Sequence, residues 1–121
     1  MHQFDHEKLS VYQSAINFVG WSSALLNDLP KSLAVHNQFD RAATAIPLNI
    51  AEGNGKHTPN DRCRYFDIAR GSALECAACL DVLVARQRIS SGVAEEGKMA
   101  LIKIVAMLVG LIRANSETRR V

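Results

Sequence analysis

The sequence has few of the residues that interrupt helices: its 121 residues include only three prolines and seven glycines. With 48% hydrophobic and 21% charged residues, the composition excludes disordered and fibrous chains, which are richer in proline, glycine or charge. The alternation of apolar and polar residues that marks a half-buried strand is also missing. A chain of this length suffices for one core, so we predict a single domain over residues 1–121.

Net charge and long apolar runs are also lacking. The 14 Lys and Arg against 12 Asp and Glu give a net charge of +2, so an argument for nucleic-acid binding must rest on local clusters. The longest apolar run, Ile104 to Ile112, is far shorter than the roughly 20 residues that span a bilayer. We therefore expect no transmembrane helix and no membrane partner.

Cysteine is scarce and odd in number, with Cys63, Cys76 and Cys79. Because the N-terminus also lacks an apolar signal segment, we expect a reducing, cytoplasmic location. Cys76 and Cys79 have the spacing of a redox pair, but they fall in the middle of an expected helix, away from the helix start that lowers a thiol pKa. We interpret them as small packing residues.

Patterns for metal binding and catalysis are missing as well. No histidine follows a Glu by three positions, as a di-iron bundle requires, and one cysteine pair cannot complete a four-ligand zinc site. Side chains suited to nucleophilic catalysis are present, but no spacing clusters them. We therefore predict no metal, no cofactor and no catalytic residue.

Apolar residues at spacings of three and four predict four long helices. The first runs from about Asp5 to Asn27, and the second from Lys31 or Ser32 to a left-handed stop at Gly53-Asn54-Gly55. The third begins at Pro59 behind an N-cap at Thr58 and ends near Gln87; the fourth is capped by Ser90 or Ser91. The expected faces are Leu9, Tyr12, Ile16, Val19, Ser23 and Leu26 in the first helix, and Val35, Phe39, Ala42, Ile46, Asn49 or Ile50, and Gly53 in the second.

Four long helices with short connections predict an all-α, antiparallel, up-down-up-down four-helix bundle. Pro47 lies inside the second helix, where proline removes an amide donor and clashes with the carbonyl of Ala43. We expect a kink at Pro47, with a break into two helices as the alternative. The third and fourth helices are apolar over more than one face, so we predict a homo-oligomer that buries the excess.

Basic residues are concentrated near the start of the third helix. Lys56, Arg62, Arg64 and Arg70 are opposed there only by Asp61 and Asp67, while Arg86, Arg88 and Arg113, followed by Arg119 and Arg120, add charge near two other helix ends. Two interpretations remain: a nucleic-acid-binding surface, or a solvated face with intrahelical ion pairs. Sequence alone slightly favours the second, because phosphate binding requires several of these residues to converge in space.

Four polar residues lie beside the apolar stripes: Arg41, Asn49, Glu52 and Glu75. A polar group near a core must be hydrogen-bonded or paired. We therefore expect a buried structural network in which Arg41 pairs with Glu52 or Glu75, and Asn49 bonds the carbonyl that Pro47 leaves without a donor. Gly71-Ser72 is interpreted as a point where a neighbouring helix crosses closely.

Several segments together resemble a known family. They are Phe4-x-x-x-x-Leu9-x-Val11-Tyr12, Gln38-x-x-Arg41-Ala42-Ala43, Ile46-Pro47-Leu48-Asn49-Ile50-Ala51-Glu52-Gly53 and Ile68-Ala69-Arg70-Gly71-Ser72-x-x-Glu75. The chain resembles the bacterial four-helix-bundle proteins encoded by intervening sequences of large-subunit ribosomal RNA genes, a family that includes the accessory variability protein of diversity-generating retroelements.

The resemblance implies a ring-like pentamer without enzymatic activity. For the retroelement member it further implies a basic surface that binds nucleic acid and a partner reverse transcriptase. Two functions are therefore expected for this chain: a non-catalytic accessory protein that binds RNA or DNA through some of the basic residues named above, or a structural or interaction oligomer with no nucleic-acid ligand.

Overall fold

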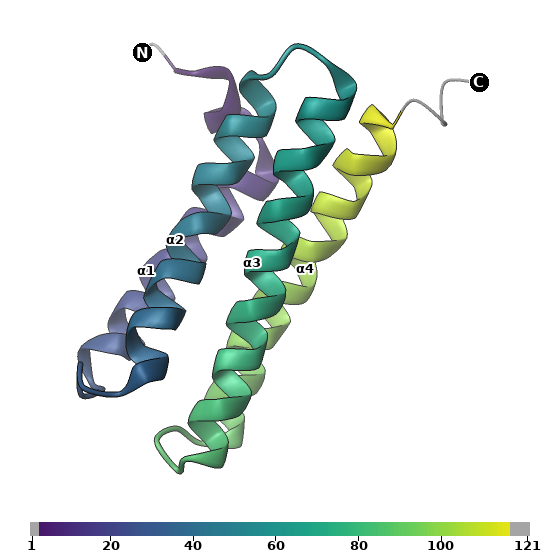
Figure 1. The fold of residues 1–121 in the computed structure, drawn as a ribbon. Coiled ribbons are helices and arrows are strands. Elements are labelled where there is room, and N and C mark those ends of the chain that lie inside the picture. Colours follow the sequence, from purple (N-terminus) through teal and green to yellow (C-terminus); the bar gives the residue numbers. More distant parts are fainter. Residues whose placement is uncertain (1–2, 117–121) are drawn as a thin grey trace.

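The bundle is described by a computed structural model covering residues 3–116. A short 3-10 helix, η1 (Asp5–Lys8), precedes four α-helices: α1 (Ser10–Asn27), α2 (Ala34–Gly55), α3 (Pro59–Ala85) and α4 (Ser91–Asn115). Residues 3–116 contain no strand. Successive helices run in opposite directions (Figure 1), which confirms the all-α up-down-up-down bundle.

One hydrophobic core lies between the four helices. α2 packs chiefly against α3, α3 also packs against α4, and α1 closes the bundle against α2 and α4. Fully burying a large apolar side chain contributes about 1.5–3 kcal/mol. The largest fully buried side chains are Phe18, Phe39, Phe66, Ile46, Ile50, Leu80, Leu83, Ile104 and Leu108.

The sequence signals for helix starts are confirmed at both places where they are strongest. Thr58 Oγ1 accepts a hydrogen bond from the Asp61 amide at 3.2 Å, and Pro59 is the first residue of α3. Ser90 Oγ accepts one from the Val93 amide at 3.1 Å and caps α4. In each case a side-chain oxygen satisfies an amide that has no partner within the helix.

The left-handed conformation that we expected at the end of α2, over Gly53-Asn54-Gly55, does not occur. Gly55 is the last residue of α2, and Lys56 after it has an extended backbone conformation. No glycine within residues 3–116 has a positive φ. Gly53 serves packing instead: a Cβ atom there would lie 2.8 Å from Phe66 Cε1 and 3.1 Å from the Arg62 carbonyl oxygen. The glycine therefore allows α2 to approach α3.

The left-handed conformation occurs at the end of α3, at Gln87, where φ is 61°. The Gln87 amide donates to the Val84 carbonyl and the Arg88 amide to the Leu83 carbonyl, both at 2.9 Å. These two bonds form a Schellman motif, in which the amides of a left-handed residue and of the residue after it donate to the last carbonyls of a helix.

α2 passes through Pro47 as one helix, so a break into two helices is excluded. Asn49 Nδ2 donates to the Ala45 carbonyl at 2.8 Å, whereas the expected acceptor was the Ala43 carbonyl, which Pro47 deprives of its usual donor. The expected kink stays a prediction. The apolar stripe of α2 is confirmed, since all its apolar members are buried.

The buried face of α1 differs from the expected one by a shift of about one residue along the sequence. Ile16 is 45% exposed and Ser23 is exposed, whereas the buried residues of α1 are Val11, Ala15, Phe18, Ser22 and Leu26. Two overlapping apolar stripes run along α1, and spacing alone does not choose between them. Phe18 decides the choice, because its ring packs against Phe39 of α2 with ring centroids 6.2 Å apart.

Candidate nucleic-acid interface

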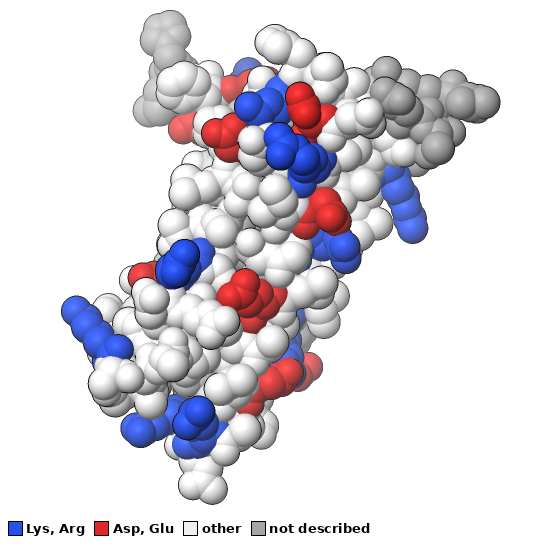
Figure 2. All heavy atoms as spheres, viewed as in Figure 1, with Lys and Arg blue, Asp and Glu red and all other residues white. Residues whose placement is uncertain are grey.

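The predicted basic residues lie at two opposite ends of the bundle. Lys56, Arg62 and Arg64 lie at or near the start of α3, and Arg70 lies further along the first half of this helix. Arg113 lies at the same end of the bundle as the start of α3, in the last turn of α4. Arg86 and Arg88 follow the other end of α3, about 33 Å along the helix axis from Arg64 at 1.5 Å per residue. Figure 2 shows Lys and Arg at both ends of the visible face. One protomer therefore does not bring all seven together, and Arg119 and Arg120 lie outside the described residues.

Arg62 makes its contacts inside the protomer. Its Nη1 donates to the carbonyls of Asn54 at 2.7 Å and Lys56 at 3.2 Å, and its Nε donates to Asn115 Oδ1 at 2.9 Å. The guanidinium also lies 5.7 Å from the centroid of the Phe66 ring. Arg62 thus joins the end of α2, the start of α3 and the end of α4, which gives it a structural role. Its predicted nucleic-acid contact stays a prediction.

The ring of Tyr65 contacts two of the remaining cations. Lys56 Nζ is 5.1 Å and Arg64 Cζ 4.7 Å from the centroid of its ring, within cation–π range. Arg64 is exposed and has no described carboxylate at ion-pair distance. We give the name α3 basic surface to Tyr65 and the two cations that contact its ring, Lys56 and Arg64, together with Arg70 further along the helix. The sequence predicted its three basic residues but not Tyr65.

Two cations of the α3 basic surface have acidic neighbours. Lys56 pairs with Glu52 at 3.4 Å, and Arg70 pairs with Asp67 at 3.0 Å. Pairs this exposed are worth about 0–1 kcal/mol. Such weak pairs leave both cations available to a phosphate group, although they reduce the local positive charge.

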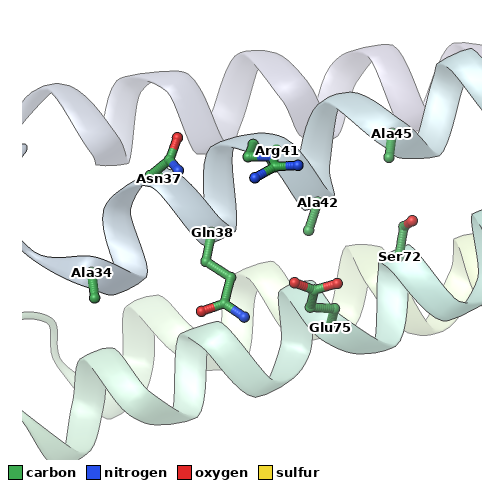
Figure 3. Close-up of a pocket in the computed structure, with 8 residues that line it drawn as sticks. All are labelled: Ala34, Asn37, Gln38, Arg41, Ala42, Ala45, Ser72 and Glu75. Atoms are coloured by element: carbon green, nitrogen blue, oxygen red, sulfur yellow. The ribbon is translucent and has the colours of Figure 1, made fainter.

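The expected buried network is wrong. Arg41, Glu52 and Glu75 are exposed and Asn49 is half-buried, and among the described residues Arg41 pairs with neither glutamate. For Arg41 and Glu75 the physical reason is a cleft between α2 and α3 that admits water to both side chains. We name it the α2–α3 cleft; its volume is about 550 Å³, and it is lined by Ala34, Asn37, Gln38, Arg41, Ala42, Ala45, Ser72 and Glu75 (Figure 3).

Gly71, beside this cleft, has open space around it. A Cβ atom there would meet nothing within 4 Å, so the close crossing expected at Gly71-Ser72 does not occur within the protomer. Sequence reasoning missed the cleft because it assumed that the polar motif residues were buried. The i, i+3 spacings of Gln38 with Arg41 and of Ser72 with Glu75 were the available signal, since each places two polar residues on one helical face.

The cysteines lie among packing residues, as expected: Cys76 and Cys79 are buried and all three thiols are free. Burial, with smaller effects of Cys79 and Glu75, raises the pKa of the Cys76 thiol to about 12. Burial and then Glu75 also raise the pKa of Cys79. At neutral pH both are thiols rather than nucleophilic thiolates.

Within residues 3–116, no three His, Cys, Asp or Glu side chains gather as metal ligands, and no helix is long and apolar enough to cross a membrane.

The fold and its basic ends define a small four-helix-bundle protein. More particularly, the chain belongs to the 23S rRNA-intervening sequence protein family, whose family model matches residues 7–110. Its fold is shared by the crystal structure of a protein of unknown function from the S23 ribosomal protein family of Bacteroides thetaiotaomicron VPI-5482. That likeness has a TM-score of 0.80 at 23% sequence identity and covers 85% of this chain and 98% of the other. No curated protein matches the chain.

Proposed function

We propose that this protein is a non-catalytic, homo-oligomeric accessory protein of the cytoplasm that binds RNA or DNA through the α3 basic surface. The observation that carries the proposal is the placement of Lys56 and Arg64 against the ring of Tyr65. Cations that contact phosphates beside an aromatic ring on which a base stacks are the recurring elements of single-strand binding sites. Arg113, at the same end of the bundle, extends this surface, and Arg86 and Arg88 form a second basic end.

Exposed apolar residues on α3 and α4 support oligomerisation. Leu74 is 50% and Ile102 66% exposed, and both line a groove of about 540 Å³ between the two helices, together with Ala77 and Val105. Because soluble monomers rarely expose large apolar patches, we propose that a neighbouring copy covers this groove. The number of copies in this proposal, five, comes from the family resemblance.

Nucleic-acid binding is tested by fluorescence anisotropy with labelled single-stranded RNA and DNA. The wild type is expected to bind at about 50 mM salt and to lose affinity steeply as salt rises, because binding releases counterions. The double variant Arg64→Gln/Arg70→Gln is expected to lower the slope of log affinity against log salt by about 1 for each phosphate group that the variant no longer neutralises.

The matched control is Lys31→Gln/Lys103→Gln, which removes the same charge from exposed positions outside the α3 basic surface. It is expected to leave the salt slope unchanged. No binding by the wild type at about 50 mM salt, or an equal effect of the two double variants, would exclude the proposed surface.

Oligomerisation is tested by sedimentation equilibrium at micromolar concentration. A pentamer has five times the chain mass of 13.3 kDa, and Leu74→Glu/Ile102→Glu is expected to dissociate it by placing charges in the apolar groove. Leu48→Glu is the control, because Leu48 is also exposed, at 62%, but lies on α2. A wild-type mass of 13.3 kDa would contradict the proposed assembly.

A structural or interaction oligomer without a nucleic-acid ligand is the second candidate. It is favoured by the pairing of Lys56 with Glu52 and of Arg70 with Asp67, and by the use of Arg62 inside the protomer. It predicts an oligomer in sedimentation and no anisotropy change at any salt concentration. A reverse transcriptase partner, which the resemblance suggests for one branch of the family, belongs to the first candidate.

A further inference from the structure

The α2–α3 cleft carries one cation and one anion on opposite walls. Arg41 lies on α2 and Glu75 on α3, and both are exposed. Figure 3 shows the Glu75 carboxylate turned towards α2 and the Gln38 carboxamide turned towards α3. Within residues 3–116, neither charged group belongs to an ion pair. Both charges are therefore open to a ligand that enters the cleft.

The other lining residues suit a small polar ligand. The carboxamides of Asn37 and Gln38 both donate and accept hydrogen bonds, and the Ser72 hydroxyl does the same. The short side chains of Ala42 and Ala45 leave space between the helices, and the volume of about 550 Å³ lies within the range of small-molecule sites. The cleft thus offers polar contacts between two opposite charges.

The pair of charges defines the class of ligand. A phosphate group would be attracted by Arg41 and repelled by Glu75, whereas an isolated cation would be repelled by Arg41 and attracted by Glu75. No lining residue is aromatic, so the cleft has no ring on which a nucleobase would stack. A neutral molecule with separated positive and negative groups satisfies both walls at once.

We propose that the α2–α3 cleft binds a small zwitterion of the amino-acid class. The ligand carboxylate accepts hydrogen bonds from the Arg41 guanidinium, whose planar donors match a carboxylate bidentately. The ligand ammonium donates to the Glu75 carboxylate, and Gln38 and Ser72 hydrogen-bond the polar side-chain groups of ligands that carry them. The cleft shares no residue with the α3 basic surface, so a test of this site does not depend on whether the protein binds nucleic acid.

Isothermal titration calorimetry of the full chain with each of the twenty proteinogenic amino acids tests the site. At least one is expected to bind with a dissociation constant below about 10 mM. Its N-acetyl derivative lacks the ammonium and its α-amide lacks the carboxylate, so each is expected to bind at least about tenfold more weakly, because a hydrogen bond to a charged group is missing.

Two variants test which charged group of the ligand each residue binds. The Arg41→Gln variant is expected to bind the amino acid no better than the wild type binds its α-amide. The Glu75→Gln variant is expected to bind the amino acid no better than the wild type binds its N-acetyl derivative. Lys103→Gln removes an exposed charge from α4 and is expected to bind like the wild type. Circular dichroism checks that the variants are folded, as surface substitutions should be.

Three results would overturn the proposal. They are the absence of binding by all twenty amino acids, equal binding of the derivatives, and unchanged affinity in both variants. A direct Arg41–Glu75 ion pair that closes the cleft, or a neighbouring copy that covers it, gives the first of these results.

Discussion

Trp21 on α1 lies against the backbone of Gly97 on α4. A Cβ atom at Gly97 would come 2.6 Å from Trp21 Cη2 and 2.8 Å from Leu80 Cδ1, so only glycine allows α1 and α3 to pack this closely on α4. The indole also donates to Glu96 Oε1 at 3.2 Å, which fixes the ring beside the glycine.

Gly97→Ala is therefore expected to lower the free energy of unfolding by about 1–3 kcal/mol, the usual cost of overpacking, despite the better helix propensity of alanine. Gly110→Ala is the matched control on the same helix, because a Cβ there meets nothing within 4 Å. It should raise stability by up to about 1 kcal/mol. Urea denaturation measures both, and equal stabilisation of the two variants would contradict the close contact.

Replacement of Arg62 should destabilise the bundle without specifically changing nucleic-acid affinity. Arg62→Ala removes donors from the half-buried Asn54 carbonyl and from Asn115 Oδ1. The free energy of unfolding should fall by about 1–3 kcal/mol, because these acceptors lose their partners. Arg64→Ala, two residues away and exposed, should change stability by less than about 0.5 kcal/mol and weaken nucleic-acid binding. Thermal denaturation and anisotropy, measured on both variants, separate the two roles. The reverse assignment of effects would show that Arg62 is the binding residue.

Gln87→Gly should stabilise the protein. Gln87 has φ of 61°, a conformation that costs a residue with a side chain roughly 1–2 kcal/mol and glycine little. Because glycine also gains freedom in the unfolded chain, the expected net gain is about 0.5–1 kcal/mol. Gln87→Val should have the opposite effect, since a branched Cβ is least tolerated there. Chemical denaturation gives the sign, and destabilisation by glycine would argue against the Schellman motif.

Stability should fall in alkaline solution because of Cys76. Its thiol pKa rises from an ordinary 9.0 to about 12 in the folded chain, so the folded state holds this proton more tightly than the unfolded state. Between these two values the unfolded state ionises first, and the unfolding free energy then decreases by up to about 1.4 kcal/mol per pH unit. Below pH 9.0 this contribution is fully present. The control Cys76→Ala should show a shallower decline above that pH, and an identical decline in both proteins would contradict the effect.

The architecture was predictable because each helix carries a local signal. Thr58 and Pro59 mark the start of α3 through an amide that needs an acceptor, and the α2 stripe from Val35 to Ile50 repeats with the period of a helix. These signals act within a few residues of the chain. The face of α1 was not predictable in the same way, because the choice between Ile16 and Phe18 depends on contact with Phe39 from another helix.

The candidate sites show the same division. Sequence identified the basic residues near the start of α3, but the internal role of Arg62 depends on Asn115, which is 53 residues away. Arg41 and Glu75 stand out in the sequence as unusual polar residues, yet their exposure follows from the width of the α2–α3 cleft. Spacing along one helix does not determine the distance to the next helix.

The passage of α2 through Pro47 has a consequence for how the protein opens. α2 lacks one backbone hydrogen bond at Pro47 and also contains Gly53 and Gly55, so its own helix propensity is low. It is helical because its buried stripe packs on α3. Slow amide hydrogen exchange in α2 should therefore disappear together with that of the facing part of α3, as one cooperative unit rather than as two separate helices.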